Sequence, residues 1–168
     1  MDKVQELNER AIGEGFVGWY NEVHSASFHF VGRPETAPDL TYCDGESRIH
    51  LEVAMAYYNE ADAAFKWKHA RGLPDAPSTM GGVNLTDKLI TNISSVLAEK
   101  CLKSYGPNCI LVLNVIPAVT EAERLEARLS EIAMPSRQPF EGIYLTGHFG
   151  SSSHSSGGFR CWRLDAGA

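Results

Sequence analysis

The strongest constraint on the fold is a nearly continuous apolar run in the second half of the chain, CILVLNVI at residues 109–116. A strand that is apolar at almost every position must be covered on both faces, as happens in a parallel or mixed sheet with helices on each side. An amphipathic pattern over residues 84–105 precedes the run, and the break between them is Tyr105-Gly106-Pro107. These features predict the central strand of an α/β domain, preceded by a long helix.

Other segments extend this pattern to a whole domain. Residues 3–23 have helical spacing, and the turn at Asp44-Gly45-Glu46 is typical of a β-hairpin. The remaining predicted elements are strands at 27–31, 40–43, 48–57, 142–146 and 159–164, and helices at 59–71 and 120–132, the latter with a capping box at Thr120 and Glu123. We therefore expect one domain over residues 1–168, with a mixed sheet of five or six strands and helices on both faces.

Composition limits the setting in which the protein works. The net charge of −6 argues against a protein that coats nucleic acid through a broadly basic surface. No apolar run is long enough to cross a bilayer and the N-terminal segment is polar, so we expect no membrane anchor and no signal peptide. The four cysteines have neither CxxC nor zinc-site spacing, which predicts reduced, packed thiols and a cytoplasmic location.

Lys100 is the most unusual residue of the long helix, because it lies where the apolar face requires a leucine. That face is defined by Leu89, Ile93, Val96 and Leu97. An ammonium group aimed at a protein interior costs free energy unless an anion meets it there. The alternative is a lysine whose chain runs along the helix and reaches water. The inward position predicts a buried acidic partner.

The predicted hairpin supplies two acids. With the turn centred on Gly45, the sequence numbers of two paired residues add up to about 90. Asp39 therefore faces Leu51 or Glu52. Directly opposed side chains have Cβ atoms roughly 5 Å apart, and two carboxylates at that distance repel unless a cation or a proton lies between them. Oxygen ligands from Asp39 and Glu52, with the backbone carbonyl of Val53, suit Mg²⁺ or Mn²⁺. Taken singly, each acid also fits a solvated turn or strand residue.

The order helix, three strands, helix, strand, with Pro38-Asp39 ahead of Glu52-Val53-Ala54, resembles the PD-(D/E)xK superfamily of restriction-endonuclease-like proteins over about residues 3–116. The resemblance implies a restriction-endonuclease-like core followed by a C-terminal extension. The family usually has a lysine two residues after the glutamate, where this chain has Ala54. In some branches that lysine lies on the following helix, which makes Lys100 its candidate replacement.

The resemblance also implies a contribution from the first helix, which often adds an acidic residue to the metal site. Glu9 matches that role best, with Glu6 and Glu14 as weaker matches. We therefore predict a metal-dependent nuclease in which Asp39 and Glu52 hold Mg²⁺ or Mn²⁺. Lys100 would orient the attacking water or stabilise the transition state.

A second hypothesis is a catalytically inactive nuclease-like domain that serves binding or assembly, which Ala54 and the negative net charge favour. The expected partner is nucleic acid, with DNA favoured over RNA, and no membrane. A homodimer or a partner protein is compatible with either hypothesis. If Lys100 does not replace the family lysine, the inactive form follows.

One basic segment is a candidate nucleic-acid contact. Lys66, Lys68, His69 and Arg71 surround Trp67 in the predicted helix 59–71. Cationic groups contact phosphates and an aromatic ring stacks on bases, but an ordinary solvated helix face fits equally well.

Two other combinations were weaker candidates for chemistry. Cys43 with His50 offers a thiol and a base without a third orienting group, and a packed cysteine with a surface histidine is the simpler interpretation. His148 and His154 flank a serine- and glycine-rich loop, where they are candidate metal ligands or idle surface residues.

Overall fold

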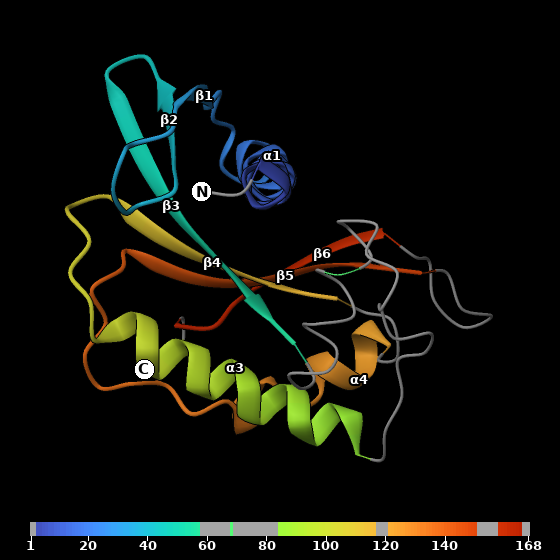
Figure 1. Cartoon of the computed structure of the whole chain (residues 1–168). Helices are drawn as coiled ribbons and strands as arrows, with labels where there is room; N and C mark the ends of the chain where they lie inside the picture. Colours follow the sequence, from blue (N-terminus) through green and yellow to red (C-terminus); the bar gives the residue numbers. More distant parts are fainter. Residues whose placement is uncertain (1–2, 58–67, 69–83, 117–120, 151–157, 166–168) are drawn as a thin grey trace.

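The chain folds around a six-stranded sheet whose strands lie in sequence order, β1 to β6 (Figure 1). The structure is a computed structural model that describes residues 3–57, 68, 84–116, 121–150 and 158–165. The strands are β1 (His29–Gly32), β2 (Leu40–Asp44), β3 (Ser47–Ala56), β4 (Cys109–Val115), β5 (Gly142–Phe149) and β6 (Gly158–Arg163). The helices are α1 (Lys3–His24), α3 (Leu85–Cys101) and α4 (Ala122–Glu126), with a 3-10 turn η1 (Leu129–Glu131).

The sheet is mixed, as the sequence predicts. The strands β1, β2 and β3 are antiparallel neighbours, β3, β4 and β5 run parallel, and β6 returns antiparallel to β5. Within β4, Asn114 is the one residue that is not fully buried. The apolar run therefore forms the central strand, covered on both faces.

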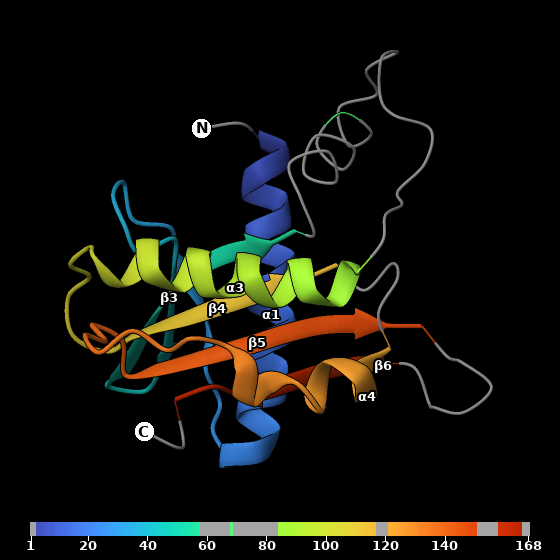
Figure 2. The same ribbon diagram turned by 90° about the horizontal axis from the view of Figure 1, so that it is seen from below.

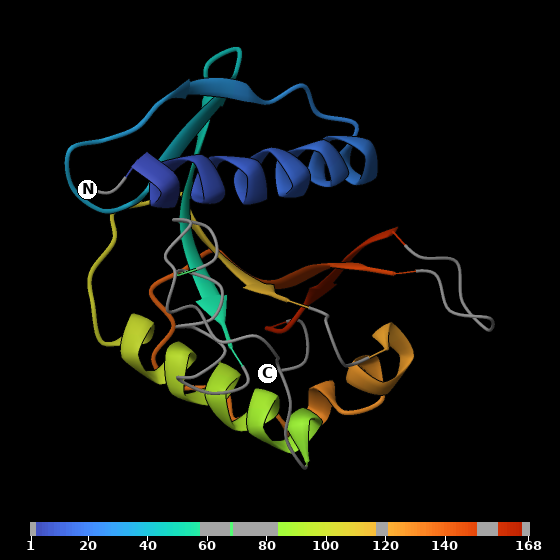
Figure 3. The same cartoon turned by 45° about the vertical axis from the view of Figure 1, so that its right-hand side comes forward.

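Helix α1 covers one face of the sheet, opposite the face that carries α3 (Figure 3). Phe16 of α1 is completely buried, and its ring centroid lies 5.0 Å from that of Tyr144 on β5. Gly13 lets the helix approach β2 closely, because a Cβ atom there would lie 2.8 Å from the Tyr42 hydroxyl and would collide with Leu40. Gly13 is therefore required for close packing of α1 on the sheet. A Cβ atom at Gly18 would have no neighbour within 4 Å, so Gly18 has no such role.

Helices α3 and α4 lie on the other face (Figure 2). Leu89, Ile93 and Leu97 are buried on the inner side of α3, in the cluster that contains Leu111 and Leu113 of β4. This burial confirms the predicted apolar face of the long helix. None of the helices in the described part of the chain combines the length and apolarity needed to cross a membrane.

The predicted helix over 120–132 is wrong in its extent, since only α4 and the η1 turn form there. The backbone leaves the helical conformation at Arg128, whose φ is −119°. Beyond the end of α4, its guanidinium contacts Asp87 of α3 at 2.5 Å and Glu131 at 2.6 Å. The proposed capping box fails as well, because the residue that caps α4 is Glu121, without a side-chain cap hydrogen bond.

Several predicted segments lie outside the described residues. They include most of the helix over 59–71, the loop over 73–83 and the serine-rich loop that contains His154. Lys68 is described, and it is helical and half-buried.

Candidate active site

The candidate site lies where β2 and β3 separate. Their ladder begins with Leu40 opposite Leu51, so the following part of β3 has β4 as its neighbour on one side and no paired strand on the other among the described residues. Asp39 stands immediately before β2, at the register position opposite Glu52. Its Oδ2 atom accepts a hydrogen bond of 2.9 Å from the Val53 N–H. The predicted hairpin register therefore brings the two acids together at an open sheet edge.

Glu52 points to the α3 side of β3 and is only 5% exposed. Its Oε1 atom accepts a hydrogen bond of 2.6 Å from the Lys100 Nζ and a longer one of 3.4 Å from the Tyr105 hydroxyl. Its Oε2 atom is buried and has no hydrogen-bond partner. One carboxylate oxygen is therefore paired with a cation, and the other is buried without a partner.

Lys100 is directed inward, as its place on the helix predicts. The residue follows Leu97 on the buried face of α3, and its side chain is 18% exposed. The charge-assisted hydrogen bond to Glu52 offsets the cost of removing the ammonium group from water. The alternative of a lysine that reaches bulk water without a partner does not describe this contact.

Helix α1 contributes Glu9, which shares the buried face of the helix with Phe16 and is 7% exposed. Its carboxylate accepts hydrogen bonds from the Gln5 amide at 2.8 Å and from the Arg33 guanidinium. Arg33 also contacts Asp39 at 3.4 Å. Glu9 is thus tied to the site through Arg33.

Arg33 and Tyr105 are the site residues that sequence reasoning missed. Arg33 lies in the proline-bearing loop between β1 and β2, and Tyr105 lies just after α3. Proximity of Arg33 to the Pro38-Asp39 pair was the available signal, but only the folded loop shows where the guanidinium points. With these residues the site holds three carboxylates and two cations in contact with them.

The pKa of the Asp39 carboxyl differs from the usual value of an aspartate at the edge of a sheet. Burial raises the pKa of this carboxyl to about 6, and the nearby charges of Glu52 and Glu9 act in the same direction. The hydrogen bond from Val53 and the charge of Lys100 act in the opposite direction but do not cancel the rise. A further positive charge, in addition to Arg33 and Lys100, would therefore stabilise the carboxylate of Asp39.

Asp39 and Glu52 are the residues of this site that could hold Mg²⁺ or Mn²⁺. Among the described residues no group of three or more His, Cys, Asp or Glu side chains is arranged to hold a metal ion. Magnesium, however, is commonly bound by one or two carboxylates together with water and phosphate oxygens. Asp39 and the unpartnered Oε2 of Glu52 meet that requirement. Because N–H and C=O of one strand residue point the same way, the Val53 carbonyl faces the same edge as its N–H.

A cleft of about 280 Å³ opens beside these groups. Its walls come from α1, β3 and α3, and it is lined by Gln5, Asn8, Glu9, Val53, Ala54, Met55, Tyr57, Val96, Glu99 and Lys100. Ala54 stands where the resembled family carries its lysine. Its side chain lines the cleft together with that of Lys100.

The other candidate residues are not part of this site. His50 contacts Thr41 Oγ1 at 3.0 Å, while the Cys43 thiol donates to the Gly45 carbonyl, so they do not form a nucleophile–base pair. All four cysteines are free thiols. Burial raises the pKa of Cys109 and of Cys161 to about 12, which keeps both protonated at neutral pH.

The predicted nucleic-acid contacts Lys66, Trp67 and Arg71 lie outside the described residues. Glu6 is half-buried and lines a separate hollow on α1, and Glu14 pairs with Arg10 on the exposed side of that helix at 2.6 Å. Among the acids of the first helix, Glu9 is therefore the one that reaches the site.

Comparison with protein-family models, with curated proteins and with solved structures finds no match for this chain.

Proposed function

We propose that this protein is a divalent-metal-dependent nuclease that hydrolyses phosphodiester bonds of nucleic acid. The observation that carries the proposal is the contact of 2.6 Å between the Lys100 ammonium and Glu52, beside Asp39 at the open edge of β3. A purely structural ion pair would not need a second, half-buried acid next to it. Two acids and a lysine beside one another are the groups that metal-assisted phosphodiester hydrolysis requires, and Lys100 also lines the adjoining cleft.

Each residue has a defined task in this proposal. Asp39 and Glu52 would hold Mg²⁺ or Mn²⁺, with Glu9 assisting directly or through water. When bound, the metal would lower the pKa of the attacking water and neutralise charge on the phosphate. Lys100 has three N–H donors and uses one on Glu52. Its other donors would orient the water or stabilise the negative charge of the transition state.

Arg33 would act on the substrate side of the site. Its guanidinium now contacts Glu9 and Asp39, which neutralises both acids in the absence of metal. A planar guanidinium also suits a phosphate group, which it can bind through two parallel hydrogen bonds. Arg33 lines the hollow that also contains Glu6, so a phosphate bound there would compete with the acids for its guanidinium. Release of Asp39 would then favour metal binding.

The order of elements supports membership in the PD-(D/E)xK superfamily. Helix α1 precedes an antiparallel trio of strands, and α3 then leads to β4, which is parallel to β3. The register of β2 and β3 puts Pro38-Asp39 beside Glu52, the arrangement that the resemblance predicts. DNA remains our favoured substrate, and a cytoplasmic location our expectation.

A second function is a nuclease-like domain that binds or assembles without hydrolysis. Ala54 in place of the usual lysine favours it, as does the contact of Arg33 with Asp39, which supplies an internal cation where a metal would bind. This form would retain the Lys100–Glu52 pair for stability alone.

A hydrolysis assay separates the two functions. Labelled single- and double-stranded DNA and RNA would be incubated with Mg²⁺, with Mn²⁺ or with a chelator. We expect metal-dependent cleavage by the wild type and a loss of roughly 10²- to 10³-fold in Glu52→Gln and Lys100→Met, as for other groups that stabilise transition-state charge. Lys103→Met is the matched control, because Lys103 lies just beyond the end of α3 and pairs with exposed Glu99. Equal cleavage by all four proteins would remove Glu52 and Lys100 from the mechanism.

A further inference from the structure

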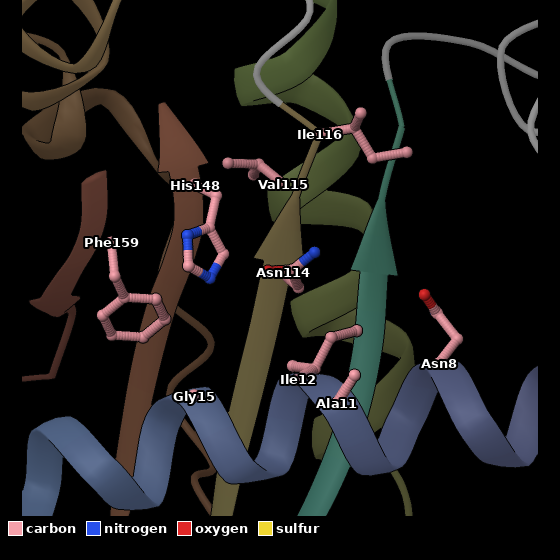
Figure 4. Close-up of a pocket in the computed structure, with 9 residues that line it drawn as sticks. All are labelled: Asn8, Ala11, Ile12, Gly15, Asn114, Val115, Ile116, His148 and Phe159. Carbon is pink, nitrogen blue, oxygen red and sulfur yellow. The ribbon is translucent and has the colours of Figure 1, made fainter. Parts of the chain in front are cut away.

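A second cavity lies next to the candidate active site, on the α1 side of the sheet near the ends of β4 and β5 (Figure 4). Its volume is about 260 Å³, and it is lined by Asn8, Ala11, Ile12, Gly15, Asn114, Val115, Ile116, His148 and Phe159. Asn8 lines this cavity and also the cleft that contains Glu9 and Lys100. The two hollows are therefore neighbours along α1.

Two amide groups in this cavity are poorly satisfied. The Nδ2 atoms of Asn8 and Asn114 both approach the Met55 sulfur, at 3.6 and 3.9 Å. A thioether is a weak acceptor, and no other acceptor for these two N–H₂ groups is found in the described part of the chain. The Oδ1 atom of Asn114 is fixed by the Thr146 hydroxyl at 3.2 Å, which orients the amide. Two donors thus lack a strong acceptor, and the amide of Asn114 is held in a fixed orientation.

The opposite wall of the cavity is aromatic. Phe159 of β6 and His148 of β5 contact each other edge to face, with ring centroids 5.3 Å apart (Figure 4). Gly15 of α1 faces them, and a Cβ atom there would lie 3.4 Å from the Phe159 ring. The absence of a side chain at Gly15 keeps the space in front of the rings open.

The chemistry of the lining indicates a neutral, planar ligand. The residues around the cavity include no Lys, Arg, Asp or Glu, so neither an anion nor a cation is favoured. Aromatic rings stack on flat ring systems, and amide donors bind ring nitrogens and carbonyl oxygens. The volume is slightly below the roughly 300 Å³ at which pockets for drug-sized ligands begin. It is suited to a single ring system.

We propose that this cavity binds one nucleobase of the nucleic acid whose backbone crosses the Asp39–Glu52–Lys100 site. The identification of this base as part of a nucleic-acid substrate rests on the proposed function. Phe159 and His148 hold the face or edge of the base, and the amides of Asn8 and Asn114 donate to its acceptor atoms. A base held there fixes the register of the strand, so that a phosphate of the same strand lies beside Lys100.

The test uses free nucleosides, which contain no phosphodiester bond, in the presence of a chelator. Adenosine, guanosine, cytidine and thymidine would be titrated into the full chain, and the side-chain amide NMR signals of Asn8 and Asn114 followed, with ribose as the ligand without a base. We expect at least one nucleoside to shift both amides in a saturable manner and ribose to shift neither. Phe159→Leu should weaken that nucleoside about 5- to 150-fold, the range measured for base–aromatic stacking.

A second variant blocks the cavity from α1 and leaves β6, the strand that contains Phe159, unchanged. Ala11 is exposed on α1 and lines the cavity, so Ala11→Phe fills the space without disturbing the core. Ala98 is equally exposed on α3 and lines neither this cavity nor the cleft, so Ala98→Phe is its matched control. We expect nucleoside binding to vanish in Ala11→Phe and to persist in Ala98→Phe.

The outcomes separate this inference from the proposed function. No nucleoside binding by the folded wild type, or unchanged binding in Ala11→Phe, overturns the base pocket even if the protein cleaves nucleic acid. Nucleoside binding that Ala11→Phe abolishes, in a protein that cleaves nothing, supports the base pocket and overturns the nuclease proposal.

Discussion

Lys100→Met is the variant whose effect on stability follows most directly from the structure. The substitution removes the cation that contacts Glu52 at 2.6 Å while keeping a side chain of similar length in the α3 face. Glu52 is then left as a buried carboxylate with the Tyr105 hydroxyl at 3.4 Å as its nearest donor, and with Asp39 and Glu9 nearby. The change therefore leaves a charge without its partner.

Removing one partner of a buried ion pair typically costs 3–5 kcal/mol of unfolding free energy. Because the Lys100 side chain is 18% exposed, we expect a value near the lower end, about 3 kcal/mol. For a chain of this length, that corresponds to a fall in Tm of roughly 6–12 °C. Urea unfolding followed by circular dichroism, in a chelator, measures it.

Two further variants make this prediction specific. Lys103→Met breaks an ion pair with Glu99 whose side chains are 53% and 68% exposed, so it should cost less than about 1 kcal/mol. The double variant Lys100→Met with Glu52→Leu should be more stable than Lys100→Met alone, since no unpaired buried charge remains. A cost for Lys100→Met no larger than that for Lys103→Met would refute the reasoning, because it would mean that water neutralises Glu52.

Three other predictions test separate parts of the account. Gly13→Ala should destabilise the protein by about 1–3 kcal/mol, because the added Cβ would collide with Leu40. Gly18→Ala, which has nothing within 4 Å of its added Cβ, should stabilise it by up to about 1 kcal/mol. Urea unfolding compares the two variants, and equal effects would contradict the close packing of α1. Since the pKa of Asp39 is raised to about 6 in the folded chain, the native state holds this proton more tightly than the unfolded state, and stability should fall as pH rises from about 4 to about 6. In Asp39→Asn, the unfolding free energy measured by urea titration without metal should lack this fall. The raised pKa would be contradicted if the wild type and Asp39→Asn differed in unfolding free energy by the same amount at pH 4 and pH 7. Replacing Lys66, Lys68 and Arg71 together by Ala should weaken nucleic-acid binding and flatten its salt dependence with little change in Tm, and unchanged binding by the folded variant would assign that segment to an ordinary solvated surface.

The features that sequence could predict are those with a short-range or periodic signal. The hairpin turn at Gly45 fixed the register that puts Asp39 opposite Glu52, and the helical period put Lys100 on the buried face of α3. The apolar run in β4 likewise identified the central strand.

The features that sequence could not predict depend on contacts between distant segments. Arg33 has no periodic pattern around it, and its role follows from a loop that folds back onto Glu9 of α1. Beyond the early end of α4, Arg128 pairs with Asp87, which is 41 residues away in the chain. Local propensity carries no information about either contact.

Calorimetric titration with Mn²⁺ tests the central claim most directly, because the nuclease proposal requires Asp39 and Glu52 to hold a metal ion. We expect the wild type to bind Mn²⁺ at millimolar or lower concentration and more weakly below about pH 6, where protons compete for Asp39. Glu52→Gln should lose this binding, and Lys103→Met should retain it. No binding by the wild type at millimolar Mn²⁺, or equal binding by Glu52→Gln, would contradict the account and favour a nuclease-like domain without catalysis.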